Sequence, residues 1–159
     1  NTSMDGFGFD VGAIYYYYPG TCVGGSTKID HTELYIGATF SMFSAKYFYA
    51  VSDYFGAPDS KGSSYFDLGF AYDLGNGFGL NAHVGYQTLE GGAQAAEIGG
   101  STPDSITDYK LGGTYSLDGG WVFGAAFVGT NRDYSLGTAT VTGKNISDNT
   151  LVVSVSKTF

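Results

Sequence analysis

The chain has 159 residues, enough for one domain with a sizeable core, and it contains 26 Gly, 14 Tyr and 12 Phe. This composition argues against a helical bundle, because glycine weakens helices and aromatic side chains favour strands. The single cysteine excludes an intrachain disulfide, and the net charge of −8 disfavours nucleic acid as a partner. The longest apolar run, "WVFGAAFVG", is too short for a transmembrane helix.

Eight segments alternate between apolar and polar residues, as strands with one apolar and one polar face do. The last segment shows the pattern: Leu151, Val153 and Val155 share one parity, and Ser154 and Ser156 share the other. In chain order the predicted strands are residues 6–18, 32–41, 42–54, 63–74, 77–88, 106–117, 121–134 and 149–159.

The connections between these segments alternate in length. Long connections follow the first, third, fifth and seventh strands, and short ones, such as "GNG" and "DGG", follow the others. Outer-membrane barrels have short periplasmic turns and longer outer loops. The sequence therefore predicts an all-β fold, an antiparallel up-and-down transmembrane β-barrel of eight strands. It would form a single domain over residues 1–159, with both chain ends on the periplasmic side.

The polar parity of these strands places charged side chains inside such a barrel. The predicted lumen-lining residues are Asp10, Glu33, Lys46, Asp67, Asp73, His83, Asp108, Lys110 and Arg132. Five acids thus face three bases, a small excess of negative charge. His83 is expected to be a hydrogen-bonded interior residue, whereas His31, at the edge of a long loop, is expected to be solvated.

Aromatic residues gather near both ends of the predicted strands, as in the interfacial girdles of membrane barrels. The predicted girdle residues are Tyr15, Tyr17, Tyr54, Phe78, Trp121 and Phe159. Two soluble alternatives remain open at this point. One is a sandwich with many core tyrosines, and the other is a lipocalin-like binder that is apolar inside and polar outside.

The amino-acid sequences of the strands resemble those of the TorF family of porins, from the proteobacterial outer membrane, over essentially the whole chain. The residues that carry the resemblance are "DGFGFDVGAIYYYYPG", "ELYIGATF", "KYFYAVSDYFG", "SYFDLGFAYDLGNGFGLNAHVGYQ", "DYKLGGTYSL" and "VVSVSKTF". The resemblance implies a family barrel of about 12 strands, within the range of outer-membrane barrels. The chain is then similar to the C-terminal two-thirds of such a protein, with a barrel incomplete at the N-terminus as one expectation.

The resemblance also implies an assembly signal at the end of the last strand, formed by Leu151, Val153, Val155 and Phe159 and recognised by the barrel assembly machinery. Lys157 departs from this pattern, because such signals more often carry an apolar or aromatic residue at that position.

No nucleophile elbow, zinc-type spacing or phosphate loop occurs in the sequence. We therefore expect no enzymatic activity, no cofactor and no metal site. The expected function is passive diffusion of small hydrophilic solutes through a Gram-negative outer-membrane channel with a weak preference for cations. The alternative is a closed structural or interaction barrel acting through its long extracellular loops. Expected partners are outer-membrane lipid, lipopolysaccharide and the assembly machinery, with no nucleic acid; a homo-oligomer or a larger envelope complex is also compatible.

Overall fold

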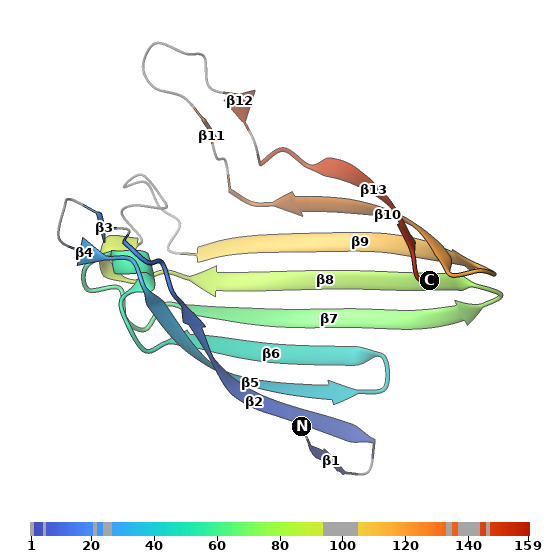
Figure 1. The fold of residues 1–159 in the computed structure, drawn as a ribbon, viewed down its shortest axis with the longest axis horizontal. Coiled ribbons are helices and arrows are strands. Elements are labelled where there is room, and N and C mark those ends of the chain that lie inside the picture. The colour runs from blue at the N-terminus through green and yellow to red at the C-terminus, as the bar shows by residue number, and fades with distance from the viewer. Residues whose placement is uncertain are drawn as a thin grey trace. The chain divides into compact units, whose positions relative to one another are not determined.

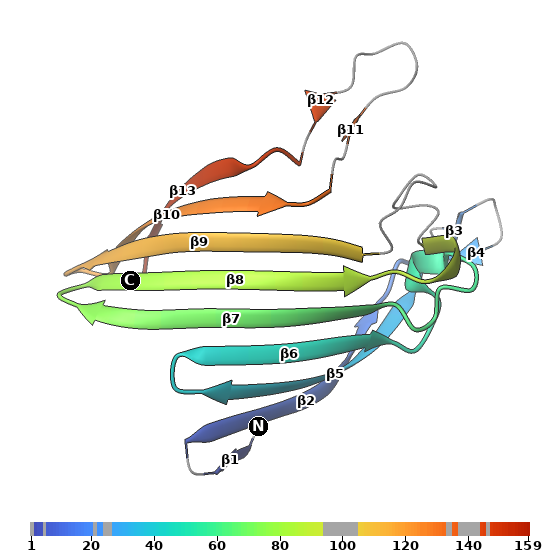
Figure 2. The same cartoon turned by 180° about the vertical axis from the view of Figure 1, so that it is seen from behind.

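A computed structural model of the chain describes residues 2–4, 6–20, 22–23, 27–93, 105–132, 135–136, 144–145 and 147–159. Its main strands are β1 (Thr2–Met4), β2 (Phe7–Tyr16), β5 (His31–Phe40), β6 (Phe43–Ala50), β7 (Ser64–Gly75), β8 (Phe78–Thr88), β9 (Ser105–Leu117), β10 (Trp121–Thr130) and β13 (Thr150–Lys157). They form one sheet in the order β1-β2-β5-β6-β7-β8-β9-β10-β13 (Figures 1 and 2).

The predicted all-β class and the antiparallel up-and-down order of the eight strands are confirmed. The short strand β1, which pairs with the start of β2, was not predicted. Two small ribbons lie in long connections: β3 (Cys22–Val23) with β4 (Thr27–Lys28), and β11 (Ser135–Leu136) with β12 (Lys144–Asn145). Helix within the described ranges is confined to short turns, none with the length and apolar character of a membrane-spanning helix.

Two predicted strands end earlier in the structure than the alternation suggested. The strand expected over 42–54 stops at Ala50, and the 3₁₀ turn η1 (Tyr54–Gly56) follows. The Asp53 carboxylate accepts hydrogen bonds from the backbone N–H groups of Ser60 and Lys61, at 3.2 and 3.3 Å. Such local bonds between side chain and backbone compete with strand pairing.

The strand expected over 121–134 likewise stops at Thr130. Beyond it, the Asn131 side chain accepts a hydrogen bond from the Thr107 N–H at 2.8 Å. The Asn131 N–H donates to the Thr107 carbonyl at 2.9 Å. These two bonds end the regular part of the β9–β10 pair.

The tight turn between β7 and β8 follows from the residues that form it. Gly75, Asn76 and Gly77 all have positive φ, at 82°, 53° and 83°. Glycine and asparagine reach this left-handed region at low cost, and the twist of such turns suits a β-hairpin.

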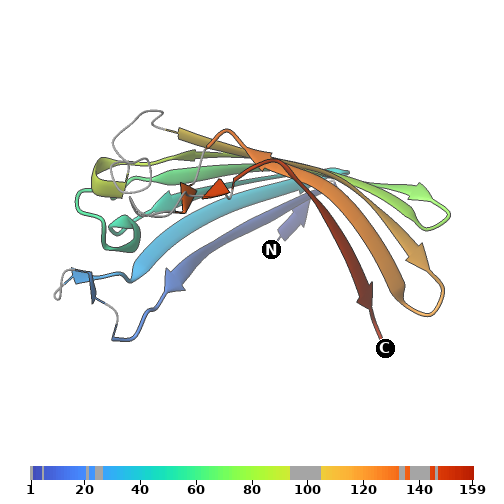
Figure 3. The ribbon, with the colours of Figure 1, turned by 90° about the horizontal axis from the view of Figure 1, so that it is seen from above.

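The chain divides into two compact units, which are described separately. The first unit comprises Asn1–Asp67 and Tyr86–Ile106, and the second comprises Leu68–Gly85 and Thr107–Phe159. In the first, β2 pairs with β5 from Phe7↔Phe40 to Tyr16↔His31, and β5 pairs with β6. In the second, β10 lies between β9 and β13. Figure 3 shows β2 beside β5 and β10 beside β13.

Very little of the apolar surface is buried in either unit. Among the described residues, the buried apolar side chains are Ala50, Leu89, Ala93 and Ile106. Large side chains on the apolar face of the strands are exposed instead. Val11 is 71% exposed in the first unit, and Val153 is 73% exposed in the second. The sheet thus presents a broad apolar face to its surroundings, rather than packing it into a core of its own.

Candidate functional site

Asp10 and Lys46, both predicted to line a lumen, form an ion pair on the polar face of the first unit. The strand register places Gly37 between them, opposite Asp10 on one side and Lys46 on the other. Because Gly37 has no side chain, the Lys46 chain can cross β5, and its Nζ lies 3.1 Å from Asp10 Oδ2. The Tyr35 hydroxyl donates to Asp10 Oδ1 at 3.4 Å. Lys46 Nζ lies 5.0 Å from the Tyr35 ring centroid.

The Tyr35 ring also covers Gly12, its partner in the β2–β5 register. A Cβ atom added at Gly12 would lie 2.7 Å from three atoms of Tyr35. The absence of a side chain at Gly12 therefore creates the space in which Tyr35 lies. Together with the ion pair, this packing fills part of the polar face of the first unit.

His31 starts β5 and is fully buried, so the expectation that it is solvated is wrong. The Tyr16 ring stacks on it at a centroid distance of 5.6 Å. Tyr54 and Phe55, which η1 folds back over β5, lie 4.9 and 4.8 Å from its ring centroid. Three aromatic rings thus exclude water from His31, although polar residues precede and follow it in the sequence.

The polar contacts of His31 indicate which of its two ring nitrogens carries the proton. Nδ1 lies 3.2 Å from the Asp53 carbonyl oxygen, which can only accept a hydrogen bond, so Nδ1 carries the proton. Nε2 lies 3.2 Å from Glu33 Oε1, within ion-pair distance, although this contact does not have the geometry of a hydrogen bond.

Ser52 is the third polar group at this position, and the trio of Ser52, His31 and Glu33 has the residue types of a hydrolase triad. Ser52 Oγ lies 3.5 Å from His31 Nδ1 and accepts a hydrogen bond from the Thr32 N–H at 2.8 Å. Since Nδ1 is a donor here, it does not act as a base toward Ser52. The trio instead anchors the connection after β6 to the start of β5.

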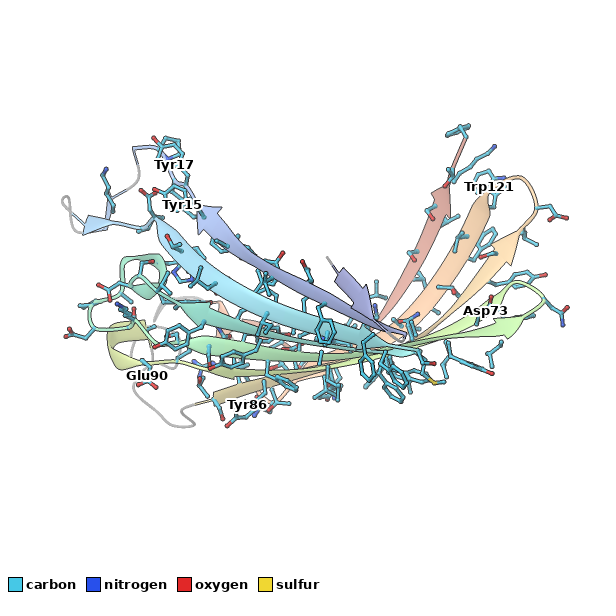
Figure 4. The ribbon with its side chains drawn as sticks, turned by 90° about the horizontal axis from the view of Figure 1, so that it is seen from below. Tyr15, Tyr17, Asp73, Tyr86, Glu90 and Trp121 are labelled. Carbon is cyan, nitrogen blue, oxygen red and sulfur yellow. The ribbon has the colours of Figure 1, made fainter. Side chains whose placement is uncertain are left out.

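Tyr15 and Tyr17, two of the predicted girdle residues, project together from the end of β2 (Figure 4). Their ring centroids are 6.1 Å apart, and both rings are mostly exposed. The Tyr15 hydroxyl donates to Asp30 Oδ2 at 3.1 Å, and the Tyr18 N–H donates to Asp30 Oδ1 at 2.9 Å. Asp30 therefore holds the chain that leaves β2. Tyr54, in contrast, does not end a strand as predicted, because it lies in η1 and packs on His31.

In the second unit, the expected hydrogen bond of His83 is present. His83 Nε2 lies 2.7 Å from Asp108 Oδ1, and both side chains are partly exposed. Asp73, seen beside the β7–β8 turn in Figure 4, accepts a hydrogen bond from the Gly75 N–H at 2.8 Å. Lys110 is exposed in β9, and Arg132 is half-buried beyond β10. Asp67, half-buried in β7, belongs to the first unit.

A hollow of about 600 Å³ lies on the polar face of the second unit, near the β7–β8 turn. Side chains that are small or form hydrogen bonds line it on this face: Ala71, Asp73, Gly79, Asn81, Thr114 and Ser116. A second hollow of about 220 Å³ shares Asn81 and Thr114 with it and continues toward Lys110. The lining of both hollows is mixed, because Tyr72, Phe78 and Leu80 also contribute to the larger one and Val128 and Val152 to the smaller one.

Trp121 and Lys157 lie opposite each other in the register of β10 and β13. Lys157 Nζ lies 4.7 Å from the Trp121 ring centroid and 4.9 Å from that of Phe159. Figure 4 shows Trp121 at the start of β10. Phe78, another predicted girdle residue, packs on Tyr115 with centroids 4.5 Å apart. Leu151, Val153 and Val155 are exposed along β13.

No group of three or more His, Cys, Asp or Glu side chains able to hold a metal ion occurs in the described part of the chain. No curated protein matches the chain, and no solved structure does. The family model described as "Bacterial protein of unknown function (Gcw_chp)" matches residues 1–159. Because this match spans the full length, the chain belongs to the Gcw_chp family of bacterial proteins.

Proposed function

We propose that this chain forms a transmembrane β-barrel in the bacterial outer membrane and conducts small hydrophilic solutes passively, with a weak preference for cations. The observation that carries the proposal is the broad exposed apolar face, backed by a polar face on the same strands. Soluble monomers rarely expose large contiguous apolar surfaces, whereas the lipid-facing surface of a membrane barrel is apolar.

Closure of the sheet is part of this proposal. In hydrocarbon, every backbone N–H and C=O must be paired within the protein, and an open sheet edge leaves a row of them unpaired. The short β5–β6, β7–β8 and β9–β10 turns would face the periplasm, together with both chain ends. The long connections would face outward, toward lipopolysaccharide. The barrel assembly machinery would insert the chain, with the Phe159 strand as its signal.

The weak preference for cations follows from the charges on the polar face. The ion pair with Lys46 neutralises Asp10. Over the polar parity as a whole, five carboxylates still face three bases: Asp10, Glu33, Asp67, Asp73 and Asp108 against Lys46, Lys110 and Arg132. Carboxylates along a pore favour cations, but salt at about 0.15 M screens exposed charges beyond roughly 8 Å. We therefore expect modest selectivity that decreases as the salt concentration rises.

Planar-bilayer recordings test this function. The chain is refolded in detergent and inserted, and the reversal potential is measured in a KCl gradient. A small potential of the sign given by K⁺ permeation, decreasing at high salt, would support the proposal. A potential of the opposite sign would contradict the charge assignment, and a chain that stays soluble and folded without detergent would contradict the membrane barrel.

A second candidate is a closed barrel that acts through its long loops. It is favoured by the packing of Tyr35 over Gly12 and by the Lys46 chain that crosses β5 to Asp10. An eight-stranded barrel is only just wide enough for side chains to fill its interior. A stably inserted protein that never conducts would favour this candidate.

A further inference from the structure

Lys157 is the one charged side chain on the apolar face of the described strands β2, β5–β10 and β13. It has the same parity along β13 as Leu151, Val153 and Val155. All the other Asp, Glu, Lys and Arg residues within these strands lie on the polar parity. A cation on an otherwise apolar face requires an explanation, because a charged side chain near the middle of a lipid-facing strand is destabilising.

The position of Lys157 removes most of this cost. It ends β13 and lies opposite Trp121, the first residue of β10. At a strand end, a lysine can bury its methylene stem along apolar surface while its ammonium group reaches the membrane interface. Trp121 is also suited to this level, since its indole has an apolar body and one N–H donor.

Within the part of the chain that the structure describes, the contacts of the Lys157 ammonium leave its charge without a counter-ion. Its contacts in the described structure are with the Trp121 and Phe159 rings, at centroid distances of 4.7 and 4.9 Å, and no described carboxylate lies within ion-pair distance. Ring faces attract a cation through their quadrupole but carry no net charge. The three N–H donors of the ammonium remain available to an anionic acceptor.

We propose that Lys157 and Trp121 bind the phosphodiester headgroup of an anionic phospholipid at the short-turn rim of the sheet. The ammonium would pair with the phosphate, and the indole N–H would be a second donor. Phe123 and Val155, which face each other one step further along the apolar face, would receive the acyl chains. This inference rests on the proposed membrane barrel, because only a bilayer brings phosphate and acyl chains to this position together.

Trp121 makes the site measurable, because it is the only tryptophan in the chain. The refolded chain is reconstituted in phosphatidylcholine vesicles that contain an equal mole fraction of dibrominated phosphatidylglycerol or dibrominated phosphatidylcholine. Bromine quenches indole fluorescence on contact. We expect dibrominated phosphatidylglycerol to quench the Trp121 fluorescence more strongly than dibrominated phosphatidylcholine. The affinity for phosphatidylglycerol relative to phosphatidylcholine should be about fivefold, the value expected for one lysine at an anionic surface.

Three variants isolate the contribution of Lys157. Lys157→Gln should bring the affinity for phosphatidylglycerol relative to phosphatidylcholine close to one. Lys157→Arg should retain the preference for phosphatidylglycerol. Lys110→Gln removes a lysine from the polar face of β9, the strand on the other side of β10, and should leave the preference unchanged. Equal quenching by the two lipids in the parent chain, or an unchanged preference in Lys157→Gln, would overturn the inference.

A further measurement distinguishes binding of a lipid headgroup from binding of free phosphate. Sodium phosphate should lower the preference no more than sodium chloride at the same ionic strength, and a larger effect would assign the site to a soluble anion and overturn the lipid assignment. Absence of quenching by either brominated lipid would contradict the membrane barrel itself. Equal quenching by both would contradict only the headgroup site.

Discussion

Lys46 on β6 reaches across Gly37 on β5 to Asp10 on β2, with 3.1 Å between Nζ and Oδ2. The pair therefore joins two strands that are not neighbours in the sheet. The two side chains are 39% and 30% exposed, so water still screens the attraction. Their contact fixes the positions of three strands relative to one another more than it adds free energy.

A double-mutant cycle on this pair should give a small coupling. Asp10→Asn, Lys46→Met and the double variant should show an interaction of about 0.5 kcal/mol in the free energy of unfolding, since pairs at this exposure contribute little. Urea titration of the vesicle-inserted protein measures it. Strict additivity would mean that the two groups do not interact in solution.

Gly12→Ala should destabilise the first unit. The new methyl group would lie 2.7 Å from the Tyr35 ring, which would have to leave its position. We expect a cost of about 1–3 kcal/mol, as for overpacking in general. Gly113→Ala is the matched control, because the nearest atom would be 3.6 Å away. Combining Gly12→Ala with Tyr35→Ser should restore most of the loss, and a full loss in that double variant would refute the steric explanation.

His31→Ala should release the connection that follows β6. The substitution leaves a cavity among Tyr16, Tyr54 and Phe55 and removes the contact to the Asp53 carbonyl. The free energy of unfolding should fall by about 2–4 kcal/mol, as for other large-to-small changes at buried sites. Limited proteolysis should cut residues 51–63 faster. His83→Ala, at a partly exposed position, should leave that cleavage rate unchanged.

Arginine substitutions test which face of the sheet meets lipid. Leu68→Arg and Leu111→Arg, both at exposed apolar positions, should cost about 2–4 kcal/mol near the bilayer midplane. Thr114→Arg, on the polar face beside the larger hollow, should be much milder. Equilibrium unfolding in vesicles would measure all three, and similar losses at Leu111 and Thr114 would mean that the faces are assigned the wrong way round.

Much of the sheet could be predicted because strand alternation is a local signal. Short turns also fix register: the two-residue turn at Ser41–Met42 pairs Phe40 with Phe43, and counting back pairs Gly37 with Lys46. The register of β2 on β5 has no such signal, since a long connection separates these strands. The sequence therefore predicted that Lys46 and Asp10 lie on the same face of the sheet, but it did not predict that they form a contact.

The burial of His31 could not be predicted for a different reason. It depends on η1, in which Phe55 adopts φ 46° and ψ 42°. This left-handed conformation is uncommon for residues other than glycine, asparagine and aspartate, so nothing in the sequence signals it at a phenylalanine. The neighbouring Asp30 and Glu33 instead suggested a solvated rim. Short β1 was missed because three residues show too little alternation.

The lengths of the strands also determine which membrane would suit this chain. β2, β5 and β10 have ten residues each, and β6 and β13 have eight, whereas β7, β8 and β9 have 12, 11 and 13, so ten residues is a typical strand length here. Ten residues at about 3.3 Å each, tilted by about 45°, span roughly 23 Å along a bilayer normal. That height is below the roughly 30 Å hydrocarbon thickness of a typical bilayer and is close to the apolar band of outer-membrane barrels. If the chain is the proposed membrane barrel, a protein with so small a core would derive much of its folding free energy from contact with lipid. Bilayer thickness would then control its stability as directly as any substitution.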